Sequence, residues 1–137
     1  MEPEILARIT TARAARDLSD LARQTVATTA ETTSPADRIL QARRLRQLAN
    51  EIVDRVVLAE ALGGASWQEI TEALNRQDPD TVRGEYEDAV AEWEAMPEDQ
   101  KAAAADGLEA LDAWYKRHRE DQDPKLATPV ADLLNRH

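Results

Sequence analysis

The 137-residue chain has no cysteine, no phenylalanine and only two histidines. The absence of cysteine excludes a disulfide framework, a zinc ribbon and a cysteine nucleophile. No run of residues is long and apolar enough to span a bilayer, and the N-terminal residues lack the basic-then-apolar order of a signal peptide. We therefore expect a cytoplasmic protein that makes no membrane contact.

Large aliphatic side chains are also scarce, since leucine, isoleucine and valine number 14, 5 and 7. Alanine, with 25 residues, takes their place. Alanine is the strongest helix former, and no segment alternates apolar and polar residues as a half-buried strand would. The composition predicts an all-α, multi-helix protein with a thin core, forming a single domain over residues 1–137. Because a second copy can supplement a thin core, we expect a homodimer.

The net charge of −10 comes from the second part of the chain. Residues 1–60 carry nine basic and nine acidic groups, whereas residues 85–112 carry ten carboxylates and a single cation, Lys101. Such an excess opposes non-specific binding of nucleic acid, because phosphate contacts need cations. It suits either a solvated helical face or a site for a basic protein partner.

The first half of the chain reads as two long helices. The first is expected from about Pro3 to Val26, followed by a threonine-rich loop that runs from Thr25 to Ser34. Ser34 is a capping residue and the proline after it suits the first helical position, so a second helix is expected to begin there. Two successive glycines at 63–64 end that helix.

Shorter helices follow. The sequence from Ser66 to Glu69 is a capping box, which predicts a short helix that buries Trp67. After a turn at 75–77, Asp78 caps a helix that ends at the Met96-Pro97 step. We expect one further helix over about 97–118, a polar linker over 120–127 and a short terminal helix that opens at Thr128-Pro129.

The segment of about 53–90 has the order of a helix-turn-helix: a helix, a short helix, a tight turn and a second helix. Residues 62–74, LGGASWQEITEAL, resemble the helix-turn-helix of small actinobacterial DNA-binding proteins that carry a GASWxEIxxAL string. That family's fold is similar to region 4 of sigma factors. The later segment 78–83, with Tyr86, resembles the start of its recognition helix. The resemblance covers about forty residues and leaves the acidic helices of about 91–137 outside it.

The resemblance implies a small regulator of transcription or of a mobile element that binds DNA. The residues it would bring to the groove are Arg76, Gln77, Thr81 and Arg83, and those it would bring to the DNA backbone are Gln68, Arg43, Arg44 and Arg46. The helix departs from the usual pattern, however, because Glu85, Glu87 and Asp88 follow its first turn. Carboxylates repel phosphate, so only the first turn is compatible with DNA.

A second function is a helical regulator that binds protein and not DNA. Its support is the acidic stretch 85–112 together with Trp93 and Trp114, since aromatic side chains beside carboxylates can bind a basic helix. Alternatively, both tryptophans fill a core that lacks phenylalanine, and we expect this role above all for Trp114.

A third function is enzymatic. Two pairs of acidic residues at helical spacing resemble the magnesium site of all-helical nucleotide pyrophosphohydrolases of the MazG type: Glu69, Glu72, Glu85 and Asp88. Such spacings also arise by chance among 27 acidic residues, and Glu69 already has a capping role. The sequence has no glycine-rich phosphate loop, so we expect no catalytic residue, no resident metal and no cofactor.

Overall fold

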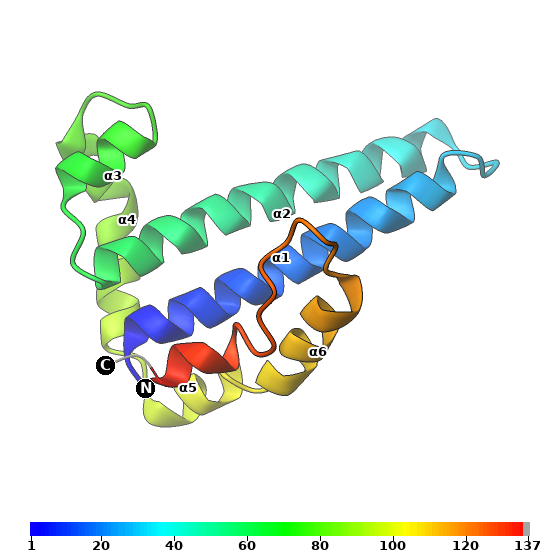
Figure 1. Cartoon of the computed structure of the whole chain (residues 1–137). Helices are drawn as coiled ribbons and strands as arrows, with labels where there is room; N and C mark the ends of the chain where they lie inside the picture. Colours follow the sequence, from blue (N-terminus) through cyan, green and yellow to red (C-terminus); the bar gives the residue numbers. More distant parts are fainter. Residues whose placement is uncertain (136–137) are drawn as a thin grey trace.

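The computed structural model describes residues 1–135. Within this range the chain forms six α-helices, one 3-10 helix and no strand, which confirms the all-α prediction (Figure 1). The elements are α1 (Pro3–Thr28), α2 (Pro35–Leu62), α3 (Trp67–Ala73), α4 (Pro79–Glu94), α5 (Glu98–Ala104), α6 (Leu108–His118) and the 3-10 helix η1 (Ala131–Asn135). None of the described helices is both long and apolar enough to cross a membrane.

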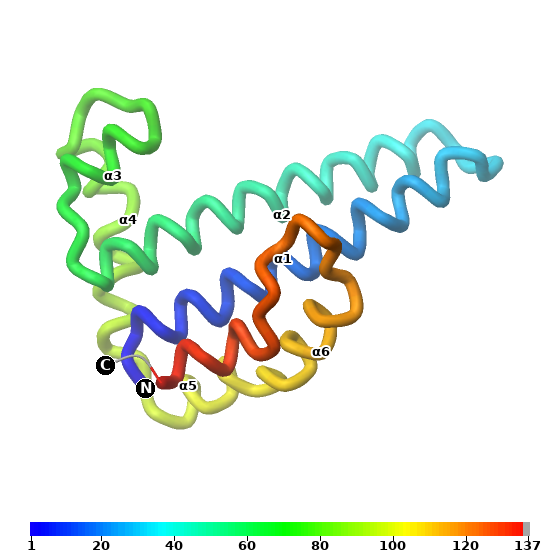
Figure 2. The backbone as a smooth tube through the Cα atoms, viewed as in Figure 1, coloured from blue at the N-terminus to red at the C-terminus, as the bar shows by residue number. Residues whose placement is uncertain are grey.

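Helices α1 and α2 pair along their length as an antiparallel hairpin, and the connecting turn projects away from the other elements (Figure 2). Helices α3 and α4 pack at the C-terminal end of α2, whereas α5, α6 and η1 pack on α1. The molecule therefore has two groups of short helices on one long hairpin.

The predicted helix starts are confirmed by their hydrogen bonds. The Ser34 hydroxyl accepts from the amide of Asp37 at 3.1 Å, and Pro35 occupies the first turn of α2. At α3, the Ser66 hydroxyl accepts from the amide of Glu69 at 3.1 Å while the Glu69 carboxylate accepts from the amide of Ser66 at 3.2 Å. These bonds satisfy backbone donors that have no partner within the helix.

The core consists of three small clusters. Ala7, Leu58 and Ala59 join α1 to α2, with Trp93 of α4 packed against them. The other two clusters are Ile9, Leu111 and Val130, which join α1 to α6 and the segment before η1, and Val57, Ile70 and Val82, which join α2, α3 and α4. Their small size agrees with the scarcity of large aliphatic residues.

The single helix predicted over 97–118 is wrong. The chain leaves the helix at Ala105, and Gly107 adopts φ +81°, a left-handed conformation in which other residues are strained. Two helices, α5 and α6, result. The break redirects the chain so that Leu108 and Leu111 reach the cluster around Ile9.

Two further predictions need correction: where the first helix ends, and the type of the last helix. Helix α1 continues to Thr28, and its threonine hydroxyls are satisfied within the helix: Thr25 donates to the carbonyl of Leu21 at 2.8 Å. At the other end of the chain, the expected short helix is the 3-10 helix η1. Buried Asp112 of α6 fixes its approach by accepting from the amides of Val130 and Ala131, at 2.8 and 3.0 Å.

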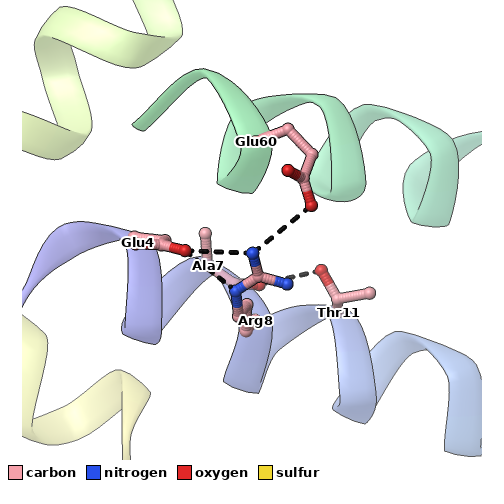
Figure 3. A network of polar contacts seen from close by, with 5 residues as sticks. All are labelled: Glu4, Ala7, Arg8, Thr11 and Glu60. Carbon is pink, nitrogen blue, oxygen red and sulfur yellow. Dashed lines mark hydrogen bonds and ion pairs between the residues drawn. The ribbon is translucent and has the colours of Figure 1, made fainter. Parts of the chain in front are cut away.

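A polar network ties the first turn of α1 to the end of α2 (Figure 3). The Arg8 guanidinium donates to the carboxylates of Glu4 at 2.9 Å and of Glu60 at 3.3 Å. The Glu4 carboxylate also lies close to the backbone at Gly63, where an added Cβ atom would be only 2.9 Å from it. Glycine at this position therefore permits the approach, besides ending the helix.

Candidate nucleic-acid interface

The end of α2, α3 and α4 form a compact three-helix unit in the order expected of a helix-turn-helix. Its centre is the cluster of Val57, Ile70 and Val82, and Leu74 and Tyr86 pack around it. The turn between α3 and α4 begins at Asn75, which adopts φ +58°. Asparagine tolerates this left-handed conformation better than most residues, because its short side chain can bond locally.

Trp67 packs against the same cluster but is only half-buried. The sequence predicts it as a buried anchor of the short helix. The fully enclosed side chain of α3 is instead Thr71, whose hydroxyl donates to the carbonyl of Trp67 at 2.6 Å.

Arg76, the first predicted DNA contact, is held by a carboxylate of α4. Its two terminal nitrogens donate to the two oxygens of Glu85, at 2.5 and 2.9 Å. This bidentate bond lowers the pKa of Glu85 and raises that of Arg76, because each charge stabilises the other. This exposed ion pair joins the turn between α3 and α4 to the side of α4 that carries Glu85.

The other predicted contacts of α3 and α4 are also engaged by acidic side chains. Arg83 lies 3.3 Å from the carboxylate of Glu87, and Thr81 donates to Asp78 at 2.5 Å. The bond from Thr81 is the main reason why the pKa of Asp78 is lowered. Gln68 donates to Glu72 at 2.8 Å, whereas Gln77 is exposed in the turn.

The predicted backbone contacts on α2 lie elsewhere. Arg43, Arg44 and Arg46 are exposed on the N-terminal half of the helix. They precede Leu62, where α3 and α4 pack, by 16 to 19 residues, which corresponds to roughly 25–30 Å along a helix. Arg44 faces Glu51 at 3.8 Å. The structure therefore does not gather these arginines with the residues of α3 and α4.

The four carboxylates of the enzymatic alternative do not form a metal site. Glu69 completes the capping box, Glu72 accepts from Gln68, and Glu85 is paired with Arg76. Across residues 1–135, no group of three or more histidine, cysteine, aspartate or glutamate residues is placed to hold a metal ion. The four carboxylates have the sequence spacing of a pyrophosphohydrolase site, but the fold does not bring them together around one metal position.

A groove of about 420 Å³ lies between α2 and α4 and was not predicted as a unit. The Tyr86 hydroxyl donates to Asp54 at 2.8 Å, and the Arg55 guanidinium lies 5.3 Å from the centre of the Trp93 ring. Burial, and then the bond to Asp54, raise the pKa of Tyr86 to about 12. Glu51 and Glu85 complete the polar rim. Of its lining residues, the sequence linked Trp93 and Glu85 to a protein partner, through the acidic stretch 85–112.

Trp114, the second tryptophan of the acidic stretch, belongs to a different part of the molecule. Its indole nitrogen donates to Asp20 of α1 at 2.9 Å, and its ring stacks on His118 with the ring centres 5.0 Å apart. The indole bond is the main cause of a lowered pKa at Asp20. Trp114 therefore fastens α6 to α1, and the two tryptophans do not share one binding site.

Comparison with known proteins gives no relative: no family model, curated protein or solved structure matches this chain.

Proposed function

We propose that this chain is a regulatory protein that uses its helix-turn-helix unit to bind a basic segment of a protein partner. The observation that carries the proposal is the charge of α4. The helix has six carboxylates and a single cation, Arg83, which is paired with Glu87. A helix with this charge distribution repels phosphate and attracts lysine or arginine side chains.

The groove between α2 and α4 supplies the shape for such a partner. Tyr86 and Trp93 contribute aromatic surface to its lining, and aromatic residues are common anchors of protein interfaces. Beside it, Glu85, Asp88 and Glu92 follow one another at spacings of three and four residues, so they form one row on α4. A partner helix with cations at the same spacing can pair with this row while an apolar side chain enters the groove.

The test uses a synthetic helical peptide with lysines at three- and four-residue spacing around a central leucine, followed by fluorescence anisotropy. We expect saturable binding, and a loss of affinity of about tenfold, or about 1.4 kcal/mol, when Asp88 and Glu92 are changed to Asn and Gln. The matched control changes Asp99 and Glu98 of α5 in the same way. Equal losses in the two double variants would show only general attraction between opposite charges and would overturn the proposal.

Sequence-specific DNA binding is the second candidate. The order of α2, α3 and α4 supports it, as does the resemblance of residues 62–83 to actinobacterial DNA-binding proteins. Gln77, Thr81 and Arg83 are exposed around the first turn of α4, where a recognition helix contacts bases.

Capture of genomic DNA fragments by the purified protein, at low and at physiological salt, separates the two functions. If the protein binds a basic partner, we expect no discrete fragments to be enriched at either salt concentration. Enrichment of discrete sites that weakens with salt, and that is lost in the double variant Arg76→Ala and Arg83→Ala, would establish DNA binding instead.

A further inference from the structure

Helix α2 has a second apolar row that no described element covers fully. It consists of Ile39, Ala42, Arg46, Ala49, Val53 and Val56, at spacings of three and four residues, and Arg46 is its one charged member. All are exposed, Ile39 by 60%, Val53 by 47% and Val56 by 42%. Buried Leu48 belongs to a different row of α2, and Val56 lies at the border between the two rows, beside Arg8 and Thr11 of α1. A row with this spacing is the pattern of a helix that packs on a further helix.

At the C-terminal end of α2 the row enters an apolar groove. The groove has a volume of about 300 Å³ and lies between α2 and α3, with Val53, Val56, Ile70, Ala73 and Leu74 in its lining and Glu60 as its charged residue. It lies on a different side of α2 from the groove that contains Tyr86 and Trp93, since the two share no lining residue.

The charges on this side of α2 indicate what covers the row. Arg38 and Arg46 follow its three- and four-residue spacing in the N-terminal half of the helix, and Glu60 follows it at the C-terminal end. Glu51 and Asp54 line the groove of Tyr86 and Trp93 on the other side of the helix, so they do not belong to this row. Two α2 helices placed antiparallel bring the arginines of each row towards Glu60 of the other, whereas a parallel arrangement superposes like charges.

We propose that a second copy of this chain covers the row, with the two α2 helices antiparallel about a two-fold axis near Ala49 and Val53. In this register, Ala49 faces Val53 of the partner subunit, and Arg46 lies within about one helical turn of the partner's Glu60. That carboxylate already accepts from Arg8, but its oxygens have capacity for a further donor. The two hairpins then form a four-helix arrangement with a self-complementary interface.

The dimer leaves the groove of Tyr86 and Trp93 open, so this inference is independent of the proposed function. The mass of the purified chain in solution, measured by light scattering during gel filtration, provides the first test. A chain of 15.3 kDa gives a dimer of about 31 kDa. We expect Val53→Glu to return the mass to that of one chain, because it places a carboxylate at the centre of the interface. The matched control, Val26→Glu, lies at a more exposed valine of α1 and leaves the dimer intact.

Because the natural chain has no cysteine, single cysteines can report the register directly. An equimolar mixture of Ala49→Cys and Val53→Cys is expected to form the mixed disulfide on mild oxidation. Val56→Cys alone is not expected to form a disulfide between its two copies. In an antiparallel pair centred between residues 49 and 53, these two cysteines lie about 15 Å apart along the helix axis. Gln47→Cys, exposed on another face of α2, is the negative control. A wild-type mass of one chain, or efficient self-linking of Val56→Cys without the mixed disulfide, would overturn the proposal.

Discussion

At the scale of single residues, Tyr86 connects the helix-turn-helix unit to α2. Its ring packs on the cluster of Val57, Ile70 and Val82, and its hydroxyl donates to Asp54, 32 positions earlier in the sequence. Both the burial and the carboxylate disfavour the phenolate, so the neutral side chain is held in place. Tyr86 therefore links the packing of α4 to the polar rim of the groove.

This environment predicts an unusual titration. Absorbance of tyrosinate should show one transition near pH 12 in the folded protein, because the pKa of Tyr86 is raised to about 12. A tyrosine whose pKa is raised by folding stabilises the native state fully below the unfolded pKa of about 10, and this contribution is lost as the pH rises from there towards 12. Tyr86→Phe is expected to remove the transition and Tyr115→Phe to leave it. Survival of the transition in Tyr86→Phe would contradict the assignment.

At the scale of helices, the ends are determined mainly by local chemistry. Two glycines have opposite effects on stability, because one lies before a helix and the other within one. Gly107 adopts φ +81° before α6, whereas Gly84 lies within α4. A Cβ atom at either position meets nothing within 4 Å, so the backbone alone decides the outcome of a substitution to alanine.

We expect Gly107→Ala to lower the free energy of unfolding by about 1 kcal/mol, because alanine is strained in the left-handed region. Gly84→Ala should raise it by roughly 0.5–1 kcal/mol, because alanine is the better helix former. Urea unfolding followed by circular dichroism measures both. Changes of the same sign in the two variants would show that α5 and α6 are not separated by the conformation of Gly107.

The helix starts could be predicted because Ser34, Ser66 and Asp78 act within three residues of themselves. The break near Gly107 could not, since the four alanines before it favour a continuous helix. The candidate site shows the same division. Arg76 and Arg83 were found on the expected segment, but the bond from Arg76 to Glu85 crosses a turn and that from Tyr86 to Asp54 joins distant helices. Contacts of this kind depend on packing and leave no periodic signal.

At the scale of the whole molecule, α1 is the element that holds the two groups of helices together. Ala7 packs with α2 and α4, while Ile9, two residues later, packs with Leu111 and Val130. Both side chains are fully buried. Different faces of one helical turn therefore contribute to two of the three clusters, and these clusters should lose their structure together.

Ile9→Ala is expected to lower the free energy of unfolding by about 2–5 kcal/mol, the usual range for removing a large buried aliphatic side chain. Helix content and tryptophan fluorescence should report one transition at the same urea concentration. Val26→Ala, at a position that is 73% exposed, is the control and should change the stability by less than about 0.5 kcal/mol. Two separate transitions would show that the clusters unfold independently.

The cluster of Ile9, Leu111 and Val130 also determines the order in which the chain can fold as it leaves the ribosome. The long hairpin of α1 and α2 is complete after 62 residues, but the side of α1 that carries Ile9 is not fully covered until Val130 has been made. At about 5–20 residues per second, the 68 residues from Gly63 to Val130 take roughly 3–14 s to synthesise. Throughout that interval Ile9 of the nascent hairpin stays accessible to chaperones, until the segment around Val130 packs against it.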